Sequence, residues 1–130
     1  MTPQAADFLA KARKLLGEAD IMLGAALHEA AGRAAYLACF HAAQAIIFER
    51  EKRVLKTHNG VQSEFLRLTK DDTRVDLVLR PLLSRTYDLK AIADYETGPD
   101  SEISAAQATE AVEGAKCFVA HFAGLFAQGS

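Results

Sequence analysis

The stretch that decides the fold is residues 33–48, with the sequence RAAYLACFHAAQAIIF. It contains no Gly, no Pro and, after Arg33, no charged side chain, and its many Ala residues favour a helix. A helix that is apolar nearly all round has to be covered by other elements on several sides. The sequence therefore predicts a central helix here, and we expect its polar side chains Arg33, His41 and Gln44 at or near an interior groove.

Length and composition limit what this helix can belong to. The chain has 130 residues, which is enough for one domain with a sizeable core. Its net charge of −2 provides no general basic field, so any contact with nucleic acid has to be local. Cys39 and Cys117 lie in apolar helical patterns, where reduced, buried thiols are expected. Without a signal peptide or an apolar run of about 20 residues, we expect a cytoplasmic protein with no membrane contact.

Apolar spacing and capping signals outside the central stretch predict four more helices. Thr2 and Pro3 are suited to begin the first, and Ser104 with Gln107 forms a capping box for the last. The predicted ranges are 3–24, about 61–68, 81–96 and from 105 onward. Since the pattern requires no strand, the predicted fold is all-α: an up-and-down four-helix bundle with one additional short helix, in a single domain of residues 1–130.

The chain lacks the motifs of the commoner enzyme classes. It has four His residues, but no pair has the helical spacing and the neighbouring carboxylates of a metal site. It also has no Gly-rich phosphate loop and no nucleophile elbow. The sequence therefore predicts neither a metal site nor a cofactor.

Two groups of polar residues remain as candidate sites. Arg33 and His41 are eight residues apart on the central helix, which separates them by about 80° around its axis and about 12 Å along it. Their side chains can converge on one small anion. Lys90, Asp94 and Tyr95 form the second group, near the end of the fourth predicted helix. The alternative is structural: Arg33 pairs with a buried carboxylate such as Asp94, and His41 is a hydrogen-bonded core residue.

Three segments resemble, in order and spacing, signatures of the HEPN (higher eukaryote and prokaryote nucleotide-binding) family, in its small stand-alone prokaryotic branch. They are RAAYLACFHAAQA at 33–45, KTHNGV at 56–61 and ADY at 93–95. The resemblance covers about residues 5–125 and implies a helical bundle that dimerises. Such proteins are often encoded beside a minimal nucleotidyltransferase in a toxin–antitoxin pair. Active members of the wider family are metal-independent ribonucleases that use an Arg and a His four to six residues apart.

The chain departs from that pattern at two positions. Seven residues separate Arg33 from His41, and Lys90 stands where members of this branch often carry an Arg shortly before Ala-Asp-Tyr. For a ribonuclease, His41 is the candidate general acid or base and Arg33 the phosphate ligand. His58 is then a candidate for the second acid–base group.

The sequence therefore supports two alternative functions. The first is the toxin-side member of a toxin–antitoxin pair, acting as a metal-independent ribonuclease with Arg33 and His41 as catalytic residues. The second is a non-catalytic dimeric module that binds a nucleotide or a partner such as a minimal nucleotidyltransferase antitoxin. In both, the binding residues are His58, Lys90, Asp94 and Tyr95, the partner classes are RNA or a nucleotide, and the chain is a homodimer. If the Arg33 and His41 side chains are exposed to solvent in a groove, catalysis or ligand binding is favoured. If they are buried and paired with other residues, a structural role is favoured.

Overall fold

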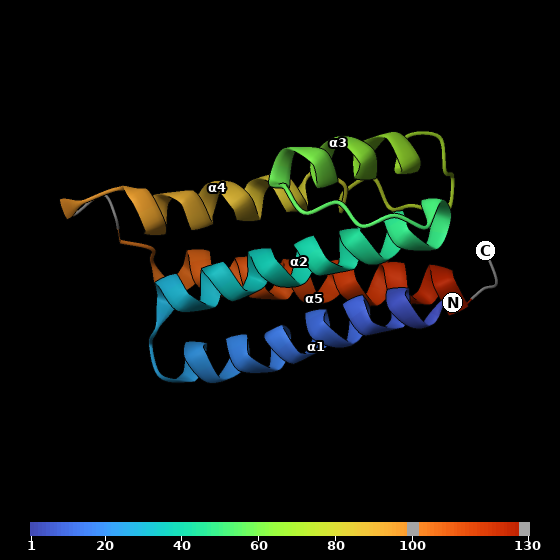
Figure 1. Cartoon of the computed structure of the whole chain (residues 1–130). Coiled ribbons are helices and arrows are strands. Elements are labelled where there is room, and N and C mark those ends of the chain that lie inside the picture. The colour runs from blue at the N-terminus through green and yellow to red at the C-terminus, as the bar shows by residue number, and fades with distance from the viewer. Residues whose placement is uncertain (99–101, 128–130) are drawn as a thin grey trace.

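The computed structural model describes residues 1–98 and 102–127, and this part of the chain consists of helices and their connections, with no strand (Figure 1). The five helices are α1 (Pro3–Gly24), α2 (His28–Glu51), α3 (His58–Thr69), α4 (Leu82–Tyr95) and α5 (Ala105–Ala127). The prediction of an all-α helical bundle is confirmed. The predicted short helix is α3, which begins three residues earlier than its apolar pattern indicated because Thr57 caps it.

The Ala-rich stretch lies at the centre of the bundle, as predicted. It forms most of α2, which contacts each of the other four helices. Figure 1 shows α2 between α1 on one side and α3 and α4 on the other, with α5 behind it. Ala35, Ala38 and Ala42 are fully buried, and their small side chains allow neighbouring helices to approach closely.

Local capping explains where three of the helices begin. Thr2 Oγ1 accepts a hydrogen bond from the backbone N–H of Ala5 at 3.3 Å and starts α1. Thr57 Oγ1 accepts from Gly60 N at 3.1 Å and starts α3. The capping box predicted for the last helix is confirmed: Gln107 N donates to Ser104 Oγ at 3.0 Å, and Ser104 N donates to Gln107 Oε1 at 2.9 Å.

Three buried Phe rings join α3 to α5. The ring centroid of Phe65 lies 5.4 Å from that of Phe118 and 5.5 Å from that of Phe122, and the last two rings are 4.8 Å apart. Cys39 is also fully buried, and burial raises the pKa of its thiol to about 12. The same prediction for Cys117 was wrong, because this residue lies on the outward face of α5 and is exposed.

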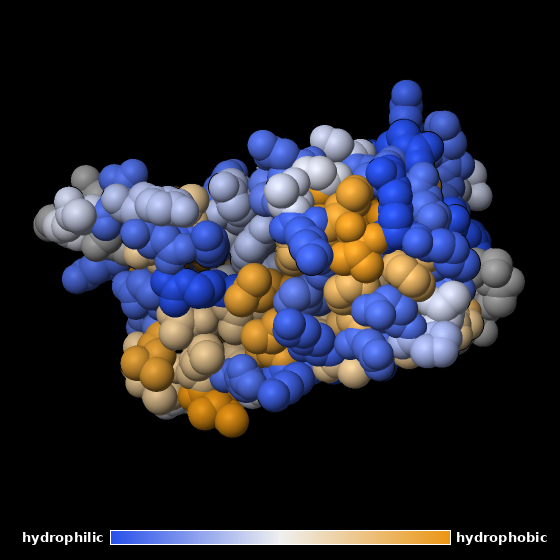
Figure 2. Space-filling model, in the orientation of Figure 1, coloured by the Kyte–Doolittle hydropathy of each residue, from blue (hydrophilic) through white to orange (hydrophobic). Residues whose placement is uncertain are grey.

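The surface seen in the orientation of Figure 1 carries both apolar and hydrophilic side chains. Figure 2 shows apolar patches at the turn between α1 and α2 and along the segment between α2 and α3, separated by hydrophilic side chains. Exposed aliphatic residues there include Ile21, Leu27 and Val54. Within the ranges that the structure describes, no helix combines the length and hydropathy that a bilayer crossing needs.

Candidate functional site

Arg33 on α2 is paired with Asp94 on α4. Arg33 Nε donates a hydrogen bond to Asp94 Oδ1 at 3.1 Å, and a terminal guanidinium nitrogen donates to the same oxygen. The predicted pairing is thus confirmed. The expected burial was wrong, because the Arg33 and Asp94 side chains are 42% and 21% exposed. Asp94 is the penultimate residue of α4.

Lys90 binds the second oxygen of the same carboxylate. Its Nζ lies 2.9 Å from Asp94 Oδ2, one helical turn away on α4. The hydrogen bond from Arg33, followed by that from Lys90, lowers the pKa of Asp94. Two cations and one anion therefore share a small, partly exposed area between α2 and α4.

Two aromatic rings flank the Lys90 ammonium. Its Nζ lies 5.9 Å from the ring centroid of Tyr87 and 5.6 Å from that of Tyr95. These distances are typical of cation–π contacts. The Tyr95 side chain is 73% exposed, so one of its faces is available for a ligand.

His58 brings the first turn of α3 to the same place. Its ring stacks on Tyr87 with 3.7 Å between centroids and 10° between planes. Its Nδ1 lies 3.0 Å from the hydroxyl of Tyr36 on α2. Burial lowers the pKa of His58, with Asp88 opposing the shift and Lys90 adding to it. Burial also raises the pKa of Tyr36 to about 12, so the Tyr36 hydroxyl keeps its proton at neutral pH.

His41 lies in different surroundings, next to α1. Its Nδ1 is 2.7 Å from Gln44 Oε1, and the Gln44 amide donates to the carbonyl of Leu55 at 2.8 Å. Its ring is stacked at 6.4 Å from that of Phe8. Burial is the largest influence on the pKa of His41 and lowers it. No hydrogen bond or ion pair joins His41 to Arg33 in the part of the chain that the structure describes.

The structure thus groups all four predicted binding residues with Arg33 and leaves His41, the other predicted catalytic residue, apart. We call the group on α2, α3 and α4 the α2–α4 cluster. Its members are Arg33, Tyr36, His58, Tyr87, Lys90, Asp94 and Tyr95. Tyr36 and Tyr87 were not among the predicted site residues. Helical spacing contained a signal for both, because Tyr36 lies three residues after Arg33 and Tyr87 three residues before Lys90.

Comparison with known proteins identifies the family. The model of the HEPN domain matches residues 5–122, nearly the whole chain. The chain belongs to the HEPN domain family. HEPN domains commonly dimerise, and the family is often associated with ribonucleases and toxins. No curated protein matches the chain.

Proposed function

We propose that this HEPN protein binds RNA or a nucleotide at the α2–α4 cluster. The observation that carries the proposal is the position of the Lys90 ammonium, which lies beside the rings of Tyr87 and Tyr95 and shares Asp94 with Arg33. Proteins that bind single strands combine cations for the phosphates with aromatic rings on which bases stack. The exposed ring of Tyr95 supplies such a platform next to the Lys90 ammonium.

The charges of the cluster favour a weakly charged ligand. Arg33 and Lys90 bring two positive charges, and Asp94 compensates one of them. Since one positive charge remains, a phosphodiester with a single negative charge fits better than a triphosphate. A single-stranded RNA segment is therefore the ligand we favour within this class.

The binding test uses a fluorescently labelled, single-stranded RNA and measures anisotropy at two salt concentrations. Tyr95→Ala should weaken binding by roughly tenfold, the size of one lost base–aromatic stack. Lys90→Ala should weaken it and reduce its salt dependence. Lys14→Ala, a change at an exposed lysine on α1, is the matched control. If Lys90→Ala and Lys14→Ala lose the same amount of affinity for RNA, the binding is non-specific electrostatic attraction and the proposal is contradicted.

A second function, metal-independent RNA cleavage, is favoured by His58 in the same cluster, because burial lowers the pKa of its imidazole. A neutral imidazole can accept the proton of a ribose 2′-hydroxyl as that oxygen attacks the adjacent phosphate. The phosphorus–O5′ bond then breaks, the 5′-oxygen takes up a proton, and a 2′,3′-cyclic phosphate remains. Arg33 and Lys90 would stabilise the charge that develops on the phosphate oxygens.

The cleavage test asks which histidine acts. Purified protein is incubated with bulk RNA in the presence of a chelator, alongside His58→Ala and His41→Ala. Loss of activity with His58→Ala alone supports the α2–α4 cluster, because removal of a general acid–base group costs about 10²–10⁴ in rate. Loss with His41→Ala alone supports the pair of Arg33 and His41 predicted from the sequence. If the wild-type protein is no more active than either variant, the proposal of RNA cleavage is contradicted.

The partner that we propose is a minimal nucleotidyltransferase acting as antitoxin, with the HEPN chain as the toxin-side member. Family membership supports this proposal. Co-expression with such a protein, encoded next to this chain, should yield a stable complex in size-exclusion chromatography. Separate elution of the two proteins would contradict it.

A further inference from the structure

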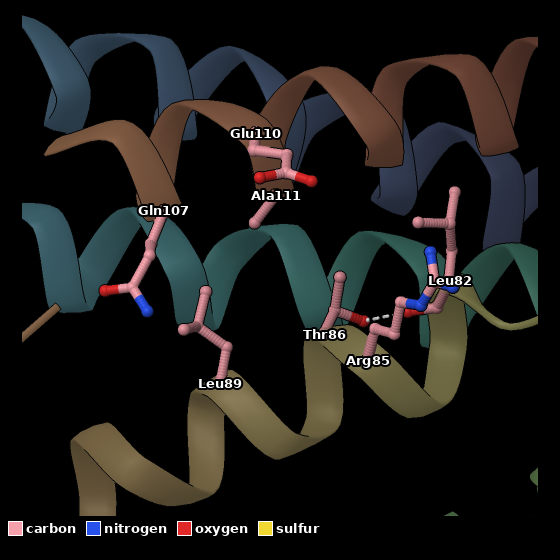
Figure 3. A pocket seen from close by; sticks show the side chains of 7 residues that line it. All are labelled: Leu82, Arg85, Thr86, Leu89, Gln107, Glu110 and Ala111. Atoms are coloured by element: carbon pink, nitrogen blue, oxygen red, sulfur yellow. Dashed lines mark hydrogen bonds between the residues drawn. The ribbon is translucent and has the colours of Figure 1, made fainter. Parts of the chain in front are cut away.

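A strand bound at the α2–α4 cluster can continue either across α4 or along α2. Across α4 it meets a pocket between α4 and α5, with a volume of about 160 Å³ (Figure 3). The lining of this pocket has no aromatic side chain, and among its described residues the cation Arg85 is matched by the anion Glu110. The pocket therefore offers neither a ring for a base nor a net positive charge for a phosphate. The lining residues are Leu82, Arg85, Thr86, Leu89, Gln107, Glu110 and Ala111.

Along α2, by contrast, a stripe of side chains faces outward. Arg33, Leu37 and His41 follow one another at four-residue steps, so they lie on one side of the helix. The Arg33 side chain is 42% exposed, and Leu37 and His41 are partly exposed. Figure 1 shows this helix between α1 on one side and α3 and α4 on the other. The stripe leads from Arg33 in the α2–α4 cluster to His41 beside α1, over about 12 Å along the helix axis.

The hydrogen bonds of Gln44 fix the tautomer of His41. The Gln44 amide nitrogen donates to the carbonyl oxygen of Leu55 at 2.8 Å, so the amide oxygen faces His41. This oxygen lies 2.7 Å from His41 Nδ1 and can only accept, so Nδ1 has to carry the proton. The lone pair of the neutral ring is then on Nε2, for which the described residues supply no hydrogen-bond donor. Burial lowers the pKa of His41, which favours this neutral form.

Phe8 and Lys11 on α1 flank the same imidazole. The ring of Phe8 lies nearly parallel to that of His41, with 6.4 Å between centroids and 15° between planes. Lys11 follows Phe8 by one helical turn, is exposed, and lies close enough for its charge to lower the pKa of His41. No anion among the described residues pairs with Lys11. An aromatic ring and an unpaired cation, the combination that favours a nucleotide strand, therefore occur at this end of the stripe too.

We propose that single-stranded RNA bound at the α2–α4 cluster extends along this stripe to a second subsite, formed by Phe8, Lys11 and His41. There His41 Nε2 accepts a hydrogen bond from a ribose 2′-hydroxyl. This subsite rests on the RNA binding proposed for the cluster and defines its substrate class. A stacked strand rises about 3.4 Å per nucleotide, so a distance of about 12 Å from Arg33 to His41 corresponds to about four nucleotides. The substrate is therefore an RNA strand of at least this length rather than a mononucleotide.

The lone pair on Nε2 selects a donor from the bound strand. Phosphate oxygens carry only lone pairs, so Nε2 cannot bind them in this tautomer. Base N–H groups can donate, but they differ from base to base. A 2′-hydroxyl can also donate, and every RNA nucleotide has one whatever its base, whereas DNA has none. With Lys11 on the adjacent phosphate and Phe8 stacked on a base, His41 distinguishes RNA from DNA without any proton transfer.

Fluorescence anisotropy with oligouridylate and oligodeoxyuridylate tests the subsite, because these strands differ only at the 2′ position. The wild type should bind RNA of about eight nucleotides about fivefold more tightly than DNA of that length, the effect of one neutral hydrogen bond. RNA of about two nucleotides is too short to reach His41 and should bind more weakly. His41→Phe keeps a ring beside Phe8 and removes the acceptor, so it should bind the long RNA only as tightly as the DNA.

Lys11→Ala tests the cation of the subsite. It should weaken binding of both long strands and leave the short RNA unchanged, because only a long strand reaches α1. Arg13→Ala is the matched control: Arg13 is also an exposed cation of α1, but it lines a pocket with residues of α5 and should matter far less. Equal losses for Lys11→Ala and Arg13→Ala would overturn the proposal. Equal affinity of the wild type for long RNA and DNA, or an RNA preference that survives in His41→Phe, would also overturn it.

Nitrogen-15 NMR of the imidazoles provides a second measurement on the wild-type protein, with His41→Phe used only to assign the His41 signals. In the free protein at neutral pH, Nε2 of His41 should be the nitrogen without a proton. Its signal should shift when the long RNA is added, but not with the DNA. A proton on Nε2 in the free protein, or an equal shift with DNA, would overturn the assignment.

The short RNA separates failure of this subsite from failure of the proposed function. If the short RNA does not bind, or if its binding is unaffected by Lys90→Ala, the α2–α4 cluster itself is not a binding site. If the short RNA binds through Lys90 but the long RNA binds no more tightly, the cluster stands and the second subsite is contradicted.

Discussion

The imidazole of His58 lies parallel to the ring of Tyr87, 3.7 Å away, although the two residues belong to different helices. Capping by Thr57 places His58 at the first position of α3, and α4 brings Tyr87 against it. The hydroxyl of Tyr36 completes the contact from α2 at 3.0 Å. Three helices therefore fix one imidazole next to the Lys90 ammonium and its two aromatic neighbours.

The first prediction is that His58 makes folding pH-dependent below neutrality. Burial lowers the pKa of His58 in the folded chain below its ordinary value of 6.5. Below pH 6.5 the unfolded chain binds a proton that the folded chain resists, so the free energy of unfolding falls as the pH falls. Burial also lowers the pKa of His41, so this residue too makes the free energy of unfolding fall as the pH falls. His58→Phe keeps a stacked ring but no titrating group, so its stability should decrease less between pH 7.5 and 5.5. Denaturant titrations at three pH values measure this. If the free energy of unfolding of His58→Phe depends on pH as steeply as that of the wild type, His58 is not the group responsible.

The second prediction concerns the stability that the Arg33–Asp94 pair contributes. Both side chains are partly exposed, so solvent screens the pair. Asp94→Asn should therefore lower the free energy of unfolding by only about 1 kcal/mol. In calorimetry this corresponds to a decrease in Tm of about 4 °C. A loss several times larger would show that the carboxylate holds α2 and α4 together more strongly than its exposure indicates.

The same substitution should act in the opposite direction on RNA binding. Asp94 compensates charge on Arg33 and Lys90, so Asp94→Asn leaves both cations free for phosphate. Affinity for single-stranded RNA should rise, and its salt dependence should become steeper. The anisotropy assay described for Lys90→Ala measures both effects. Weaker binding by Asp94→Asn would indicate instead that the carboxylate contacts the ligand or orients the cations.

The fourth prediction uses two Gly residues in helices. A Cβ atom at Gly60 would lie 2.8 Å from Thr57 Oγ1, the acceptor that caps α3. Gly60→Ala should therefore destabilise the protein by about 1 kcal/mol, the worth of one N-cap. Gly17 in α1 has no heavy atom within 4 Å of the added Cβ. Gly17→Ala should stabilise the protein by up to about 1 kcal/mol, because Ala favours a helix over Gly. Chemical denaturation of both variants checks the opposite signs.

The fifth prediction concerns the aromatic core. Phe65 is fully buried and contacts the rings of Phe118 and Phe122. Phe65→Ala should lower the free energy of unfolding by about 3–5 kcal/mol, because it removes buried apolar surface and leaves a cavity. The measurement is urea denaturation followed by circular dichroism. A loss below about 1 kcal/mol would mean that the rings of α5 close the gap.

The sequence by itself determined the helices and the identity of the central one. The uncharged, Ala-rich run after Arg33 specified a buried α2, and Thr2, Ser104 and Gln107 specified where helices begin. These signals act between residues about four positions apart or fewer, so they can be recognised without knowing the fold. The pairing of Arg33 with Asp94 was also predicted, because an Arg on an apolar helix needs an anionic partner.

Only the tertiary structure decided which residues form one site. It placed His58 on Tyr87 and set His41 apart from Arg33, against α1. It also left Leu77 and Val78 in solvent and Asp94 partly exposed. Periodicity gives the direction of a side chain around its own helix. The neighbour that the side chain meets depends on how helices pack across distant parts of the chain, and no local pattern records that.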